Sequence, residues 1–222
     1  MKASFLNVTL LASALAFPLF HASAASVYPT VAFTTLDAGG GYSGTGGTSI
    51  TGSANGYQGF GNLFVPTVSG TLDSIGIALT STGAPELVDV ELRLDSGNGF
   101  PTGATLASGS VMTVGYLGTT STALSMFTPS VPVNLSVGTS YWLLVTPHSS
   151  TSFDVWNDET SGVIGELAGT RDGVNWGIGP NQPLNAFQVT VLVPEPSCLA
   201  LGLGGLVLFP ALRRSRTRPG NG

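Results

Sequence analysis

Hydrophobic and polar residues alternate along much of the middle of the chain. Between Leu87 and Asp95, the even-numbered residues are all apolar and the odd-numbered residues after Leu87 are all charged. Thr71–Thr80 has the same period, with Ile75, Ile77 and Leu79 on one side. A period of two with one polar face predicts antiparallel strands that pack on one side only.

The remaining apolar segments are short and are separated by turn-forming residues. Tyr141–Val145 is apolar throughout, so we expect a central strand there. Ala38–Gly56 holds eight glycines, which cost much entropy to order, and we expect a mobile loop. Further strands are expected at 27–36, 57–65, 105–114, 122–127, 153–156 and 185–193. About eight to ten short strands without a convincing helix predict an all-β fold, an antiparallel β-sandwich of jelly-roll type.

The N-terminus has the composition of a sorting segment. Lys2 precedes a mostly apolar stretch from Phe5 to Phe20, and Ala22-Ser23-Ala24 then supplies small residues. This order predicts a secretory signal peptide over residues 1–24, with a buried helix of the domain as the alternative. The exported domain then spans 25–193, and residues 194–218 form a separate C-terminal segment.

The C-terminal segment combines three features in order. Val193-Pro194-Glu195-Pro196-Ser197 is followed by an apolar run to Leu212 and by an arginine cluster, namely Arg213, Arg214, Arg216 and Arg218. As a helix, Ser197–Leu212 would be about 24 Å long, short of the roughly 30 Å hydrocarbon core. It can still cross if the arginines snorkel, which leaves them cytoplasmic and the domain outside. Its glycines permit close packing on another membrane protein, and a plain hydrophobic anchor is the alternative.

This arrangement closely resembles the PEP-CTERM sorting signal. Proteins that carry the signal are substrates of exosortase, a membrane-embedded processing enzyme of Gram-negative bacteria that make exopolysaccharide and biofilm. The resemblance covers about 25 residues. It implies recognition at Pro194-Glu195-Pro196, removal of the tail, and delivery to the outer surface or the extracellular matrix. Cys198 is not part of the signal; we interpret it as a small apolar residue, with lipidation as the alternative.

Charge and residue types exclude several kinds of chemistry. Residues 25–193 hold two arginines, no lysine and eleven acidic residues, a balance of −9, so nucleic acid is not an expected partner. The same region has no cysteine, which excludes thiol catalysis, Cys-ligated zinc and internal disulfides. Its one histidine, His148, lies among loop residues, where we expect a solvated side chain and not a member of a catalytic triad.

Two sets of residues remain candidates for binding. Asp154, Asp158 and Glu159 are weak candidates for calcium, which prefers oxygen ligands, and paired carboxylates also serve glycosidases. Surface acids that keep the domain soluble are the favoured interpretation, so we expect no cofactor and no catalytic residue. Trp156 and Trp176 lie in polar, glycine-rich stretches and are candidates for an exposed platform that contacts a glycan. Trp142 lies in an apolar strand and is expected in the core.

The domain also resembles the "choice-of-anchor" extracellular domains found ahead of this sorting signal. The resemblance is carried by segments 92–95, 138–143 and 186–189 together with the two candidate tryptophans. It implies no particular activity. We therefore expect a non-enzymatic protein that is exported through the inner membrane, anchored transiently, and delivered to the surface or matrix. The alternatives are a carbohydrate-binding or, less favoured, carbohydrate-cleaving module around Trp156 and Asp158, and a permanently anchored protein.

Overall fold

The computed structural model describes residues 26–115 and 120–195. The predicted signal peptide, the apolar helix and the arginine cluster lie outside these residues and stay predictions. Within 26–115 and 120–195, no helix is long and apolar enough to span a membrane.

The described residues form an all-β, sandwich-like fold, which confirms the predicted class. All strand pairings are antiparallel except that of β6 with β9. The strands are β1 (Val27–Thr34), β2 (Tyr42–Ser43), β3 (Gly47–Thr51), β4 (Gly59–Phe64), β5 (Gly70–Ile77), β6 (Leu79–Ser81), β7 (Leu87–Leu94), β8 (Thr105–Met112), β9 (Val114–Gly115), β10 (Thr120–Ser121), β11 (Ser125–Phe127), β12 (Asn134–Leu135), β13 (Tyr141–Pro147), β14 (Phe153–Asn157), β15 (Ile164–Thr170), β16 (Trp176–Pro183) and β17 (Phe187–Pro194). One 3₁₀ turn, Ser53–Asn55, lies between β3 and β4.

Two larger sheets enclose the main core. One has the order β16-β15-β4-β13-β7-β8, and the other has the order β1-β17-β5-β11, with β12 also paired to β5. Aromatic rings meet between them: the centroid of Phe64 on β4 lies 5.4 Å from that of Phe33 and 5.8 Å from that of Phe187. In β7, the predicted apolar residues Val88, Val90 and Leu92 are buried in this core, as their alternation indicates.

Two smaller sheets extend the structure, with orders β3-β14-β6-β9 and β10-β2. The first continues the β5 sheet through Ala78, whose N–H donates to the Ala186 carbonyl at 3.0 Å. The expectation of a mobile loop at Ala38–Gly56 was wrong, because β2 and β3 form within it. A Cβ on Gly47 would lie 2.5 Å from the Trp156 carbonyl oxygen, so this glycine permits close strand packing.

A smaller apolar cluster lies on the face of the six-stranded sheet that is turned away from the main core, which we call the outer face. Trp142 and Leu144 of β13 are fully buried there, with Trp176 and Ile178 of β16 packed against them. Gly61 lies under Leu144, leaving room for that side chain to cross β4. The prediction that Trp142 is buried is confirmed, although it packs in this second cluster and not in the main core.

A buried network of hydrogen bonds joins the sheets around Asn185. Its side-chain amide donates to Thr48 Oγ1 at 2.6 Å and to the Trp156 carbonyl at 3.0 Å. Its backbone N–H donates to Asn62 Oδ1 at 3.1 Å, and Thr35 Oγ1 donates to its carbonyl at 2.9 Å. These partners come from β3, β4, β14 and the segment after β1, so one residue links the six-stranded sheet, the β3-β14-β6-β9 sheet and the segment that follows β1.

We predict that Asn185→Ala lowers the free energy of unfolding by about 2–4 kcal/mol, because it leaves several buried polar groups without partners. Chemical denaturation with a fluorescence readout measures the change. Asn134→Ala is the matched control: Asn134 is exposed, accepts one hydrogen bond from Thr71 Oγ1, and should cost less than about 1 kcal/mol. Equal losses for the two variants would contradict the role assigned to the network.

Candidate functional site

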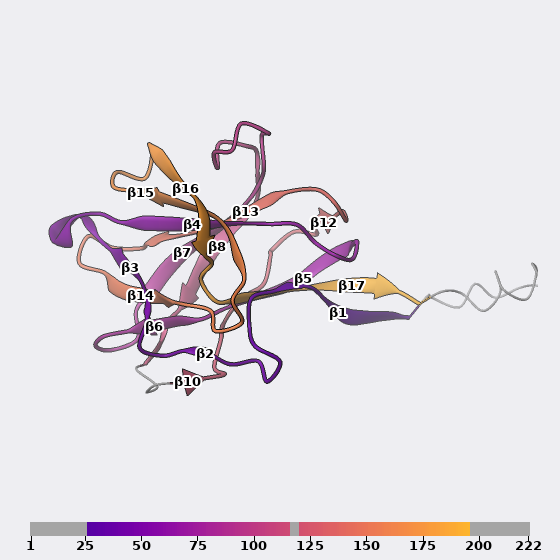
Figure 1. Ribbon diagram of the computed structural model, residues 1–222, viewed down its shortest axis with the longest axis horizontal. Coiled ribbons are helices and arrows are strands. Elements are labelled where there is room, and N and C mark those ends of the chain that lie inside the picture. The colour runs from indigo at the N-terminus through magenta and orange to yellow at the C-terminus, as the bar shows by residue number, and fades with distance from the viewer. Residues whose placement is uncertain (1–25, 116–119, 196–222) are drawn as a thin grey trace, which may run out of the picture.

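The last strand carries the start of the predicted sorting motif to one end of the molecule. β17 pairs with β1 from Thr34 to Val27, so β1 begins and β17 ends at the same tip (Figure 1). Beyond the pairing, the Glu195 N–H donates to the Ser26 carbonyl at 2.9 Å. Pro194 and Glu195 are both exposed. Val193 and Pro194 are thus held by the sheet, whereas Pro196 and Ser197 lie outside the described residues.

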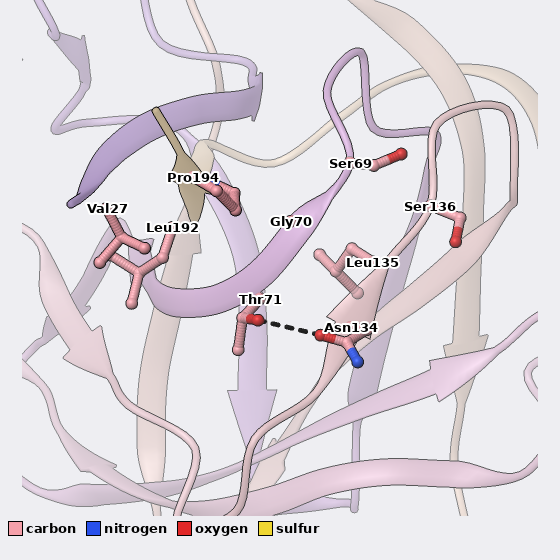
Figure 2. Close-up of a pocket in the computed structure, with 9 residues that line it drawn as sticks. All are labelled: Val27, Ser69, Gly70, Thr71, Asn134, Leu135, Ser136, Leu192 and Pro194. Atoms are coloured by element: carbon pink, nitrogen blue, oxygen red, sulfur yellow. Dashed lines mark hydrogen bonds between the residues drawn. The ribbon is translucent and has the colours of Figure 1, made fainter. Parts of the chain in front are cut away.

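A pocket of about 490 Å³ opens beside Pro194. Figure 2 shows its walls, formed by β1, β5, β12 and β17. Its lining residues are Val27, Ser69, Gly70, Thr71, Asn134, Leu135, Ser136, Leu192 and Pro194. None of these side chains is ionisable, so the lining contains no acid or base that could activate the hydroxyls of Ser69 or Ser136. It can offer only apolar contacts and hydroxyl or amide hydrogen bonds.

A row of polar side chains crosses the outer face of the six-stranded sheet. Ser110 on β8 lies opposite Asp89 on β7, which lies opposite Thr146 on β13. The next neighbour is Gly59, and a Cβ built there would lie 2.9 Å from the Thr146 methyl carbon and 3.3 Å from that of Thr170. We call Ser110, Asp89, Thr146 and Thr170 the polar row.

A groove of about 440 Å³ runs along part of this row. Its walls include Asp89, Glu91, Ser108, Ser110 and Thr146. Such a surface presents several donors and acceptors at strand spacing, which suits a ligand that carries many hydroxyl groups.

Ser110, His148 and Asp89 lie together, but not in the arrangement of a catalytic triad. His148 Nδ1 is 2.8 Å from Asp89 Oδ1, and Ser110 Oγ donates to the same oxygen at 2.6 Å. In a triad, the serine instead bonds the second imidazole nitrogen and the carboxylate bonds the first. Here Ser110 Oγ and Asp89 Oδ1 both approach the same imidazole nitrogen, His148 Nδ1, at 3.5 Å and 2.8 Å. The carboxylate therefore does not orient the imidazole from the side opposite the serine, as it does in a triad. The side chain of His148 is 45% exposed, as expected for a surface residue.

The two candidate tryptophans lie in different environments. Trp156 is fully buried, its indole N–H donates to the Ala186 carbonyl at 3.1 Å, and its ring lies 6.1 Å from that of Phe187. The prediction that Trp156 is exposed is therefore wrong. β14 lies between β3 and β6, and its Trp156 side chain points into the core. Trp176 is half-buried and lies opposite Thr170 at the end of the polar row.

The turn before Trp176 is fixed by Asp172. Its carboxylate accepts hydrogen bonds from the backbone N–H groups of Asn175 at 2.7 Å and Val174 at 2.9 Å. The Asn175 side chain donates as well, and these bonds hold the pKa of Asp172 below its usual range, the Asn175 backbone contributing most. The turn sets the start of β16 and so the position of Trp176.

The three candidate calcium ligands are not brought together. Asp158 and Glu159 are neighbours, and Glu159 accepts hydrogen bonds from Ser161 and the Gly162 N–H. Burial raises the pKa of Asp158, and the charge of Glu159 raises it further. Within the described residues, no group of three or more His, Cys, Asp or Glu side chains is placed to hold a metal ion.

Asp154 has a different and unusual environment. The residue is fully buried, and neither carboxylate oxygen has a hydrogen-bond partner within the described part of the chain. Burial raises the pKa of Asp154 to about 6, with a further increase from the charge of Glu86. The hydroxyls of Thr113 and Ser81 lie close enough to lower the pKa of Asp154, but not in hydrogen-bonding geometry.

No protein-family model matches the chain, and no curated protein matches it. The site must therefore be interpreted from its own residues.

Sequence reasoning missed two groupings that the fold creates. The polar row joins residues 110, 89, 146 and 170, which are far apart in the sequence, and Glu86 approaches Asp154 from across the fold. One signal was present: the charged face predicted for Leu87–Asp95 does place Asp89 on the outer face. The strand order that brings Thr146 beside it carries no local signal.

Stability should depend on pH through Asp154. Its folded-state pKa of about 6 exceeds the usual 3.8, so the unfolded state loses this proton first as the pH rises. The neutral Asp154 carboxyl makes its whole contribution to the free energy of unfolding below about pH 4. That contribution falls by about 3 kcal/mol as the pH rises to about 6 and slightly above.

In metal-free buffer, the unfolding free energy of the wild type should fall relative to that of Asp154→Asn by most of this amount, about 2.4 kcal/mol, between pH 4 and 7. Denaturant titrations at several pH values measure the difference. Asp73→Asn, on a half-exposed carboxylate of β5, is the matched control and should show no such trend. A difference that does not change with pH would show that Asp154 titrates normally.

Proposed function

We propose that the chain is a non-enzymatic protein of the cell surface or extracellular matrix, associated with exopolysaccharide and biofilm and sorted by exosortase. The observation that carries this proposal is the order of features in residues 194–218: Pro-Glu-Pro, an apolar run and an arginine cluster. That order resembles the PEP-CTERM signal. Exposure of Pro194 and Glu195 at the end of β17 supports it, because a processing enzyme must reach the motif.

The fold suggests how the two ends of the domain would be placed when the signal peptide and the C-terminal tail are removed. The chain is exported through the inner membrane with a signal peptide cut after Ala24, and the C-terminal helix holds it until the tail is removed. Ser26 and Glu195 are hydrogen-bonded to each other at one tip of the domain. Both predicted processing points therefore face the membrane from the same end, and the rest of the domain projects away.

Two further features belong to this proposal. The all-β, sandwich-like fold is consistent with the proposed jelly-roll type and with the proposed likeness to choice-of-anchor domains, a likeness that implies no known activity. The contacts among Ser110, His148 and Asp89 support a non-enzymatic role, since the serine and the carboxylate share one imidazole nitrogen and do not form a triad.

A second candidate function is contact with a glycan. For this contact the structure favours the outer face of the six-stranded sheet over the Trp156 region. The groove presents the exposed hydroxyls of Ser108 and Ser110 beside the partly exposed carboxylate of Asp89. The polar row ends at the buried Thr170, which lies opposite the half-buried Trp176. Sugar recognition uses such donors and acceptors together with an aromatic ring. We propose the outer face of the six-stranded sheet as the exopolysaccharide contact.

Sorting should depend on Glu195. In a bacterium that has exosortase, we expect Glu195→Gln to retain the arginine-rich tail and to accumulate in the membrane fraction. The substitution removes the charge of the motif and leaves the backbone bond to Ser26 in place. Mass spectrometry of the mature C-terminus measures the outcome, with Glu166→Gln, a half-exposed acid outside the motif, as the control. An intact tail on wild-type protein in its final location would contradict processing.

Glycan binding should depend on Asp89. On a glycan array, Asp89→Ala is expected to weaken binding to any recognised polysaccharide about tenfold, the effect of losing one charge-assisted hydrogen bond. Asp73→Ala, on the opposite sheet, should bind as the wild type does. Absence of wild-type binding to every polysaccharide would exclude this second function and leave the sorting proposal unaffected.

A further inference from the structure

Asp154 is the described residue whose burial is hardest to reconcile with its charge. It is fully buried on β14, and both carboxylate oxygens lack a hydrogen-bond partner among residues 26–115 and 120–195. Buried polar atoms nearly always have partners, and an exception calls for a specific explanation such as a bound ion. An unpaired, ionised carboxylate in the interior is strongly destabilising, so Asp154 must be either protonated or paired with a cation.

The surroundings of Asp154 are rich in oxygen. Ser81 on β6 is its partner across the strands and is buried. Thr113, between β8 and β9, is buried as well, and Glu86, just before β7, is half-buried and acts on Asp154 through its negative charge. Three separate parts of the chain therefore bring oxygen-bearing side chains toward one buried carboxylate.

These neighbours are held in place by the backbone. The Glu86 N–H donates to Thr113 Oγ1 at 2.9 Å, and the Thr113 N–H donates to the Glu86 carbonyl at 2.8 Å. The Gly83 N–H donates to Ser81 Oγ at 3.2 Å. Each hydroxyl oxygen accepts a single hydrogen bond, so each retains a lone pair. The site is preorganised without using the oxygens of Asp154.

No basic side chain of the described chain neutralises this pair of acids. The ion pairs within residues 26–115 and 120–195 join Arg93 to Glu91 and His148 to Asp89, both on the outer face. Two carboxylates that approach each other in the interior without a cation repel.

We propose that Asp154 and Glu86, with the hydroxyl oxygens of Ser81 and Thr113, bind a calcium ion. The donors are hard oxygens, which suit Ca²⁺, and no imidazole or thiolate is present to favour zinc or copper. The half-buried Glu86 gives the ion a route from solvent. This site differs from the grouping of Asp154 with Asp158 and Glu159 that the sequence alone indicates.

Calcium at this position would act on stability and not on sorting. The ion would join β14 and β6 to the residues that directly precede β7 and β9. It would thereby link the β3-β14-β6-β9 sheet to the six-stranded sheet. Binding to the folded state alone raises the melting temperature by mass action. The exported domain would then be most stable where calcium is available.

The test is thermal unfolding of the full chain in mild detergent at pH 7.5, with EDTA, with excess CaCl₂ or with excess MgCl₂. A calcium concentration of about 100 times Kd should raise Tm by roughly 5–10 °C for a domain of this size. Asp154→Asn should abolish the calcium-dependent rise, and Glu86→Gln should reduce it. Glu159→Gln, outside the site, is the matched control and should keep the full rise.

Calorimetric titration with CaCl₂ provides a second readout that does not depend on melting. The wild type and Glu159→Gln should bind one ion, and Glu86→Gln should bind more weakly. Unchanged Tm and no heat of binding for the wild type would overturn the proposal, as would an Asp154→Asn variant that keeps the full response. If Asp154→Asn does not fold, equal calcium affinities for Glu86→Gln and the wild type would overturn it. A response to magnesium equal to that to calcium would overturn the choice of ion.

Discussion

The structure depends on one buried amide, that of Asn185. Apolar contacts alone cannot fix either larger sheet relative to the β3-β14-β6-β9 sheet, because such contacts are non-directional. The Asn185 side chain and backbone bond to Asn62, Thr48, Thr35 and the Trp156 carbonyl, and these groups belong to different sheets. Hydrogen bonds in the interior are directional and costly to break, so they specify a single arrangement of the sheets.

The six-stranded sheet separates two kinds of surface. Its inner face supplies Phe64, Val90 and Leu143 to the main core, whereas its outer face is divided between the Trp142 cluster and the polar row. Gly59 and Gly61 make that division possible, because larger residues there would collide with Thr146 and Leu144. The surface proposed to contact a glycan therefore rests on a rigid, fully paired sheet and not on a loop, which favours a fixed spacing of its polar groups.

Asp154 contrasts with the other buried polar residues. Asn157 is equally buried, but its amide donates to the Ala78 carbonyl at 2.9 Å and to Thr80 Oγ1 at 3.2 Å. Evolved cores rarely keep a group that weakens the fold unless it serves another purpose. A calcium ion between Asp154 and Glu86 would turn a destabilising charge into a link between sheets, in a domain that has no cysteine available for a disulfide.

The sequence by itself determined the all-β class, the faces of β7 and the burial of Trp142, because alternation and apolar runs act over a few neighbouring residues. The resemblance to a sorting signal comes from the sequence alone, and the role of residues 194–218 in sorting stays a prediction. Tertiary structure decided the rest. Trp156 lies in a polar stretch yet is buried, and the glycine-rich segment forms strands, because their strand partners lie far away in the chain. The polar row and the approach of Glu86 to Asp154 depend on strand order, which is set by long-range packing and not by local pattern.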